Sequence, residues 1–296
     1  MTNDLLGLIG RLRPRLSKGQ RLIAGYILEH YDKAAFMTAA RLGNTVGVSE
    51  STVVRFAVEL GFDGYPGFQK ALQEMTRSRL TSVQRMEVSD ERIGSGDVLT
   101  KVLQTDIDAI RLTLDELDKS RFYAAVADII AAKKIYIMGI RSAAALAAFM
   151  EHYFTHIFEN VRNVNTTSTS VIFEQLMRIG PGDLFIGITF SRYSQRTFKA
   201  ADFAKSRGAK VLAITDSLSA PISGVADHVL VAKSDMASFV DSLVAPLSVI
   251  NALIVAIGLE KKDEIRDTYD KLERIWDEYN VYEKGEKSAA RGNSDS

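Results

Sequence analysis

The chain has 296 residues, 46 % of them apolar, which is enough to bury the cores of about two domains and excludes intrinsic disorder for most of it. Lys plus Arg equals Asp plus Glu at 37 each, so no overall basic excess draws the whole molecule to nucleic acid or to a membrane. Cysteine is absent, which excludes disulfides, thiolate metal sites and a cysteine nucleophile, and is typical of a reducing compartment.

The N-terminus does not resemble a secretory signal peptide. Its first residues, MTNDLLGLIGRLRPRLSKGQ, place charges inside the apolar run and show no small-residue cleavage site. We therefore expect a cytoplasmic protein. From Leu16 to about Arg79 the apolar residues recur at helical spacing, with short glycine-containing interruptions. This periodicity predicts an all-helical domain over residues 1–80.

A helix-turn-helix motif is predicted within this domain, where residues Thr38–Phe62 read TAARLGNTVGVSESTVVRFAVELGF. The first helix should end near Val46, and Gly47 supplies a turn residue that tolerates positive φ. Ser49 is a good N-cap for a second helix from Glu50 to Leu60. In such a motif the start of the second helix lies against the bases of duplex DNA.

The second helix separates an apolar stripe from a polar one. We expect the inward stripe to contain Val53, Val54, Ala57 and Leu60. The candidate DNA-binding residues face outward near the helix start and are Ser49, Glu50, Ser51, Thr52 and Arg55. Residues 1–80 carry 11 Lys+Arg and 7 Asp+Glu, a net charge of +4, which slightly favours DNA as the partner. The alternative is a structural helical hairpin with an ordinary solvated face.

A polar segment follows, TSVQRMEVSDERIGSG, which ends in Gly-Ser-Gly and predicts an interdomain linker over residues 81–97. Helical periodicity resumes over Val98–Leu117 and Arg121–Ala132. Beyond Lys134, short apolar runs alternate with helical stretches, which predicts an α/β domain over residues 98–282 with a doubly wound, five-stranded parallel sheet. The expected strands are Ile135–Gly139, Val161–Asn165, Leu184–Thr189, Val211–Thr215 and His228–Ala232.

The last part of this domain contains a 20-residue, largely apolar segment, Val240–Leu259. Its length would span a bilayer, but Asp241, Pro246 and Asn251 lie within it and EKKDE follows it. We therefore expect a helix in the centre of a large domain or at a subunit interface. The polar residues 283–296 are expected to be disordered.

Hydroxyl and arginine side chains gather after two of the predicted strands. GIRSAA follows the first strand and TFSRYSQRT the third. In an open parallel sheet, ligands bind beyond the carboxyl ends of the strands, where helix N-termini offer free N–H groups. Hydroxyls can donate to an anion without first losing a proton, so we expect anion binding here. The alternative is that the hydroxyls only cap helices. Thr215, Asp216 and Ser217 either line the same crevice or only turn the chain.

The sequence resembles the RpiR family of bacterial transcription regulators. The resemblance rests on SESTVVRFAVELGF and YPGF together with the later ITFSRYSQRT and AKSRGAKVLAITDS, and it covers about Leu16 to Leu259. It implies an N-terminal helix-turn-helix joined to a sugar isomerase (SIS) domain that binds a phosphorylated sugar as effector. It further implies a cytoplasmic, sequence-specific DNA-binding regulator that forms a homodimer or homotetramer, with no membrane partner. Neither a cofactor nor a metal is expected.

The phosphate-loop pattern of SIS domains, S-x-S-G-x-T, falls on residues 189–194, where Arg192 stands at the glycine position. The first-strand pattern G-x-G-x-S is also incomplete, because Arg141 stands where the second glycine belongs. A carboxylate or another anionic metabolite therefore remains an alternative to a phosphosugar. The candidate effector-binding residues are Gly139, Arg141, Ser142, Thr189, Ser191, Arg192, Ser194 and Thr197.

A phosphosugar isomerase is the competing function, because SIS domains also occur in such enzymes. Isomerisation needs a base near the substrate, usually a carboxylate or a histidine. Glu151, His152 and His156 lie two to four turns along the helix that follows the first strand, which directs them away from the strand ends. We expect them at the surface or an interface, and no catalytic residue is predicted. The helix Val98–Leu117 and the linker before it are expected to couple effector binding to the DNA-binding heads.

Overall fold

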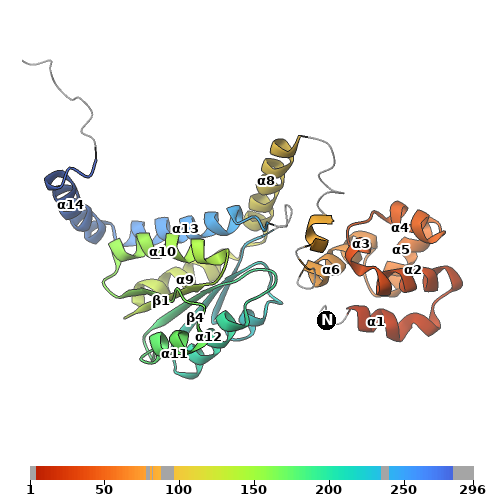
Figure 1. Cartoon of the computed structure of the whole chain (residues 1–296), viewed down its shortest axis with the longest axis horizontal. Coiled ribbons are helices and arrows are strands. Elements are labelled where there is room, and N and C mark those ends of the chain that lie inside the picture. The colour runs from red at the N-terminus through yellow and green to blue at the C-terminus, as the bar shows by residue number, and fades with distance from the viewer. Residues whose placement is uncertain (1–4, 78–80, 82, 88–96, 235–239, 283–296) are drawn as a thin grey trace, which may run out of the picture.

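The structure, a computed structural model, describes residues 5–77, 81, 83–87, 97–234 and 240–282. Most of the predicted linker, at residues 82 and 88–96, lies outside the described residues, and so does the whole predicted tail, 283–296. Figure 1 shows a helical N-terminal part on one side and a sheet with its covering helices on the other.

The N-terminal part consists of helices, as its periodicity predicted. They are α1 (Leu5–Leu12), a 3-10 turn (Arg13–Arg15), α2 (Lys18–Glu29), α3 (Tyr31–Ala34), α4 (Ala39–Val46), α5 (Glu50–Glu59) and α6 (Tyr65–Arg77). A capping box starts α2, where Ser17 and Gln20 satisfy each other's backbone N–H groups. Ile23, Leu42, Phe56, Phe68 and Leu72 are fully buried between the helices, so this part has a hydrophobic core of its own.

The second part is built on a five-stranded, all-parallel sheet, as predicted. Its strands are β1 (Ile135–Gly139), β2 (Val161–Asn163), β3 (Leu184–Ile188), β4 (Lys210–Thr215) and β5 (His228–Val231), in the order β2-β1-β3-β4-β5. After β1 the chain forms β2 on one side of β1, and it then crosses over to form β3 on the other side of β1. The topological switch point, where doubly wound sheets bind ligands, therefore lies between the ends of β1 and β3.

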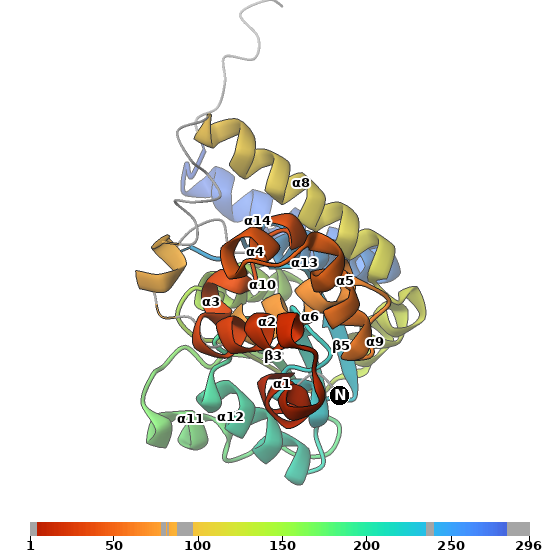
Figure 2. The same ribbon diagram turned by 90° about the vertical axis from the view of Figure 1, so that its right-hand side faces the viewer.

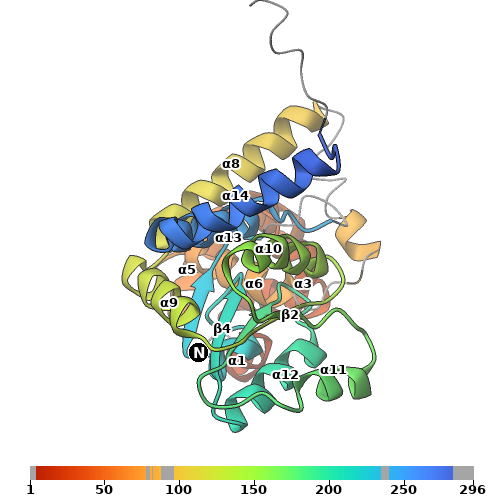
Figure 3. The same ribbon diagram turned by 90° about the vertical axis from the view of Figure 1, so that its left-hand side faces the viewer.

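Helices cover both faces of the sheet (Figure 3). One core lies under α9 (Lys119–Ala131), α10 (Ala143–Ile157) and α13 (Val244–Glu260), and the other lies under α11 (Thr169–Leu176) and α12 (Gln195–Ser206). Two further helices flank the first group, α8 (Val98–Glu116) beside α13 and α14 (Lys262–Glu278) against α10 and α13. Viewed from the opposite side, the N-terminal helices lie in front of the sheet and its covering helices (Figure 2).

The apolar segment Val240–Leu259 forms most of α13. Ile250, Leu253 and Ile257 are fully buried in the core, whereas Val255 and Leu259 are exposed. Within the described part of the chain, no single helix is long and apolar enough to cross a membrane, and the pair α13 and α14, which passes by length and composition, is bent by 99°. One face of this segment is therefore a core face, as expected for a helix in the centre of a domain.

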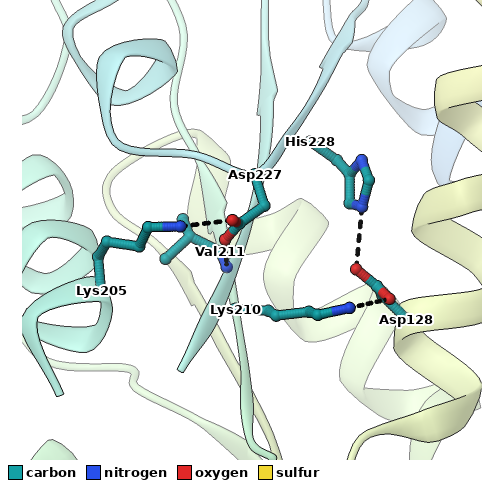
Figure 4. A network of polar contacts seen from close by, with 6 residues as sticks. All are labelled: Asp128, Lys205, Lys210, Val211, Asp227 and His228. Atoms are coloured by element: carbon teal, nitrogen blue, oxygen red, sulfur yellow. Dashed lines mark hydrogen bonds and ion pairs between the residues drawn. The ribbon is translucent and has the colours of Figure 1, made fainter. Parts of the chain in front are cut away.

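Ion pairs tie the amino ends of β4 and β5 to the neighbouring helices (Figure 4). Asp128 of α9 contacts the ammonium of Lys210 and, at 2.9 Å, Nε2 of His228. Asp227 pairs with Lys205 of α12 and accepts the backbone N–H of Val211 at 2.8 Å. Burial raises the pKa of Asp227, but the bonds from Lys205 and Val211 outweigh it and hold this pKa below its usual range. These contacts lie at the opposite end of the sheet from the switch point.

Candidate functional site

The helix-turn-helix forms at the predicted place. α4 ends at Val46, Gly47 follows with a φ of 74°, and α5 begins at Glu50. Gly43 lets the turn pack closely, because a Cβ there would lie 2.8 Å from the carbonyl oxygen of Val48. The predicted inward stripe is wrong at Val54, which is 37 % exposed. Phe56 takes its place in the core beside Val53, Ala57 and Leu60, because the helical twist carries position 56 inward.

The five candidate DNA-binding residues gather at the start of α5. Ser49 occupies the N-cap position, and its hydroxyl contacts those of Ser51 at 2.9 Å and Thr52 at 2.8 Å. Arg55 is exposed and its Nε donates to the carbonyl of Ser51 at 3.3 Å. The bond from Nε holds the side chain along the helix while its terminal nitrogens can donate to a base or a phosphate.

The loops after β1 and β3 enclose a hollow of about 300 Å³ at the switch point. Six of the eight predicted effector residues line it: Arg141, Ser142, Thr189, Ser191, Arg192 and Ser194. Ser142 and Ala143 bring the N-terminus of α10 to this hollow, and Ser194, the N-cap of α12, brings a second. Two positive helix ends therefore face the same space, which favours an anion.

Gly139 and Thr197 are not among the lining residues. A Cβ on Gly139 would lie 2.3 Å from the carbonyl oxygen of Ala143, so this glycine lets α10 pass close to the end of β1. Thr197 is fully buried, and its side-chain oxygen has no hydrogen-bond partner among the residues that the structure describes. It lies one turn into α12 and faces the sheet, where its methyl group is near Gly187. The structure thus gives both residues a place behind the hollow rather than in its wall.

Capping explains part of the hydroxyl cluster. Ser194 Oγ accepts the backbone N–H of Thr197 at 3.2 Å, and Thr189 Oγ1 accepts that of Ser194, also at 3.2 Å. Because the hydroxyl oxygen accepts in both bonds, each hydroxyl can still donate its own hydrogen to a ligand. The same side chains can therefore shape the loop and bind an anion.

Arginine stands at two strained positions beside the hollow. Arg141 and Arg192 have φ angles of 62° and 65°, in the left-handed region that glycine adopts at lower cost. These are the two positions where the SIS pattern has glycine. The loops thus keep the backbone conformation expected of glycine, and each carries a guanidinium group instead.

Asp216, which directly follows β4, accepts two hydrogen bonds from Ser191 in the loop after β3. Its Oδ2 accepts both the backbone N–H of Ser191 at 3.2 Å and the hydroxyl of Ser191 at 2.9 Å. Asp216 and Ser191 also line a second hollow of about 390 Å³, between α6 of the helical part and residues of the sheet part. At its rim Glu116 contacts Lys70 at 3.5 Å and also Lys233. The bond from Lys233 lowers the pKa of Glu116.

Comparison with known proteins agrees with both halves of this description. Residues 3–78 match the helix-turn-helix domain of the rpiR family, and residues 128–256 match the SIS domain. The chain joins a helix-turn-helix domain of the rpiR family to a SIS domain. It is 25 % identical to the HTH-type transcriptional regulator HexR of Pseudomonas aeruginosa over 265 residues, 87 % of this chain and 90 % of HexR. It is a transcription regulator with an N-terminal DNA-binding domain.

Solved structures agree with this assignment. The sugar isomerase domain of an RpiR transcription factor from Sphaerobacter thermophilus is 27 % identical, with a TM-score of 0.57 over 59 % of this chain and 97 % of that one. The NanR protein of Vibrio vulnificus, solved in complex with ManNAc-6P, is 22 % identical, with a TM-score of 0.58 over 93 % of this chain and 99 % of that one. The NanR likeness extends the shared fold to nearly the full length.

Sequence reasoning missed two charged residues of the hollow. Arg85 and Asp241 line it together with Ile140, Phe190 and Val240. Arg85 lies in the predicted linker and Asp241 at the start of the apolar segment, more than 150 residues away in sequence. Neither follows a strand, so the rule that led to the other lining residues could not find them.

Proposed function

We propose that the hollow at the switch point binds a phosphorylated sugar or a related anionic metabolite, and that this effector controls DNA binding through α5. The observation that carries the proposal is the wall of the hollow. Ser142, Thr189, Ser191 and Ser194 supply hydroxyl groups, two helix N-termini point to the same space, and Arg85, Arg141 and Arg192 add positive charge. Such a combination matches the several acceptor oxygens and the negative charge of a phosphate group.

A phosphosugar is the preferred effector within this class. NanR, which shares the fold, was solved with ManNAc-6P, and the hydroxyls lie at the positions of the SIS phosphate pattern. The two arginines at glycine positions also suit a ligand with a carboxylate, because a guanidinium group binds carboxylate and phosphate alike.

We propose a sensor rather than an enzyme. Among the described residues that line the hollow, the only carboxylate is Asp241, and Arg85 engages it at 2.6 Å. Glu151 accepts a hydrogen bond from Asn163 at 2.9 Å, and His156 contacts Tyr269 of α14 at 3.2 Å. Both groups are held outside the hollow, which leaves it poorly supplied with a base for proton transfer. Turnover of phosphosugars by the purified protein would contradict this proposal and favour the isomerase.

We propose further that the regulator is a homodimer or homotetramer. The inward face of α8 is small or polar, with Thr105, Ala109 and Thr113, whereas its large apolar side chains are exposed. The exposed stripe is Leu99, Leu103, Ile107, Ile110 and Leu114. A helix that turns its large apolar side chains to solvent is typical of an interface, and a second copy of the chain would also pair two DNA-binding heads on neighbouring half-sites.

Calorimetric titration with a panel of sugar phosphates and sugar acids tests the effector proposal. We expect a saturable complex with at least one phosphorylated sugar, and Ser142→Ala and Ser194→Ala should each weaken it about tenfold, because each removes a hydrogen bond to a charged group. Ser206→Ala is the matched control, since Ser206 lies at the far end of α12, where its hydroxyl donates to the carbonyl of Phe203. Equal affinity in all four proteins would overturn the assignment of the hollow.

A further inference from the structure

Arg85 brings a charge from outside the SIS domain into the effector hollow. It lies on a short helix over residues 83–87, between the helix-turn-helix domain and α8. Its side chain is only 3 % exposed, and its Nη1 lies 2.6 Å from Oδ1 of Asp241. Both residues line the hollow together with Ser142, Ser191 and Ser194.

The same short helix also contacts the DNA-binding domain. The neighbouring residue, Gln84, donates from Nε2 to Oδ2 of Asp32, next to the start of α3, at 3.2 Å. Two adjacent side chains therefore reach opposite parts of the molecule, Gln84 toward the helix-turn-helix domain and Arg85 into the hollow. The short helix therefore has side-chain contacts with the hollow and with the helix-turn-helix domain.

An anion entering the hollow meets the Asp241 carboxylate as a competitor. Asp241 repels a phosphate dianion and at the same time occupies the guanidinium group that the phosphate would bind. A dianion with three acceptor oxygens can replace a single carboxylate on arginine, provided that other groups hold it nearby. The hydroxyls of Ser142 and Ser194, which line the hollow, are placed to do so.

On the basis of the proposed effector site, we propose that Arg85 is an effector-binding residue that Asp241 occupies in the ligand-free protein. The effector takes the guanidinium group from Asp241, and this exchange couples occupancy of the hollow to the position of the DNA-binding domain. Breaking the pair by mutation should therefore imitate the effector.

Binding of inorganic phosphate and of glucose 6-phosphate to the full-length protein tests the exchange. We expect Asp241→Asn to bind both probes about three- to tenfold more tightly than the wild type, because the competing charge is gone. Arg85→Gln should weaken both by about tenfold. Arg111→Gln, at an exposed position of α8, is the control for loss of one positive charge and should bind like the wild type.

The two variants separate binding from structure. If the ion pair only held the fold together, both substitutions would weaken binding or leave it unchanged, and a gain of affinity in Asp241→Asn would not occur. If Ser194→Ala lowers the affinity for the probes but Arg85→Gln and Asp241→Asn leave it unchanged, this inference would be overturned while the effector site would remain in place. Failure of both probes to bind either the wild type or Asp241→Asn would overturn the effector site itself.

The coupling is tested with a DNA duplex selected by the wild-type protein from a random pool. Asp241→Asn without ligand should shift the affinity for this duplex in the same direction as saturating ligand shifts that of the wild type. Added ligand should then change the DNA affinity of Asp241→Asn less than it changes that of the wild type. An equal ligand effect in both proteins would show that the pair plays no part in transmission.

Discussion

Arg141 and Arg192 each combine an unfavourable backbone conformation with a positive charge beside the hollow. A left-handed backbone costs a residue with a side chain about 1–2 kcal/mol relative to its usual conformation, and both arginines adopt it. Glycine would avoid this cost but would leave the hollow without the two cations. Backbone strain of this kind is common at functional sites, and here it occurs at two positions where the side chain can reach a ligand.

Arg192→Gly separates the two effects. The substitution keeps the loop conformation and removes the charge, so we expect phosphate affinity to fall about fivefold, corresponding to about 1 kcal/mol for a partly exposed charge. The free energy of unfolding should change by less than about 1 kcal/mol, since relief of strain offsets the greater freedom of glycine in the unfolded chain. Calorimetry and urea denaturation measure the two quantities. Arg196→Ala, at an exposed arginine of α12 outside the hollow, should change neither, and a large loss of stability in Arg192→Gly would contradict the assignment of strain.

Arg55→Ala tests the DNA-binding surface at the same scale. Removing an arginine that contacts a base edge costs about 1–3 kcal/mol, so we expect operator affinity to fall at least severalfold. Arg121→Ala is a suitable control, because Arg121 lies on α9 and pairs with Asp118 at 3.3 Å. Gel-shift titration on a selected duplex provides the measurement. Unchanged binding would remove Arg55 from the candidate contacts.

At the residue scale, a local sequence rule predicted which side chains lie near the strand ends, while their binding roles stay predictions. The strand-end rule led to six residues of the hollow, because the sequence shows where each strand ends. It also included Thr197, since a sequence cannot show which side of the first turn of α12 faces the sheet. Arg85 and Asp241 reach the hollow through tertiary packing of distant segments, and no local pattern reports such packing.

Elements were predictable because hydrophobic periodicity is a local signal. The five strands, their parallel arrangement and the two helices of the motif agree with it. Strand ends, helix ends and the orientation of Val54 differ from the prediction, and α14 was not predicted as a separate helix. β2 ends at Asn163, two residues earlier than predicted, because its pairing with β1 extends only that far. The proposed domain boundaries at residues 80 and 97 stay predictions.

The ion pairs of Figure 4 give a stability prediction at the scale of elements. Asp227→Asn removes the pair with Lys205 that ties β5 to α12, and we expect the free energy of unfolding to fall by about 1–2 kcal/mol. Because the pKa of Asp227 is lowered in the folded protein, its contribution is complete above about pH 5 and is lost as the pH falls through the folded-state pKa. Urea denaturation at pH 7 and at pH 3 measures the difference between variant and wild type. Asp202→Asn, at an exposed position of α12, is the control, and a difference as large at pH 3 as at pH 7 would contradict the lowered pKa of Asp227.

At the scale of the whole molecule, α8 contacts both the helix-turn-helix domain and the SIS domain. Its C-terminal end contacts the helix-turn-helix domain through Glu116 and Lys70 and the SIS domain through Glu116 and Lys233. Its inner face packs on α13, and its outer face carries the exposed apolar stripe. A dimer built on this stripe would place the effector hollows and the DNA-binding heads of two chains on a common helical support.

Substitution of two residues in the stripe tests this arrangement. Ile107→Glu combined with Leu114→Glu places two charges where a partner helix would pack, and each lost apolar contact is worth about 1.5–3 kcal/mol. We expect the association constant to fall at least about 100-fold, so that the mass in solution drops toward the 32.7 kDa of one chain. Analytical ultracentrifugation measures the mass, and Lys101→Ala, an exposed position near the start of α8, is the control. Operator affinity should fall with the mass, because a single head loses the second half-site. A variant that keeps the wild-type mass would show that the chains associate through another surface.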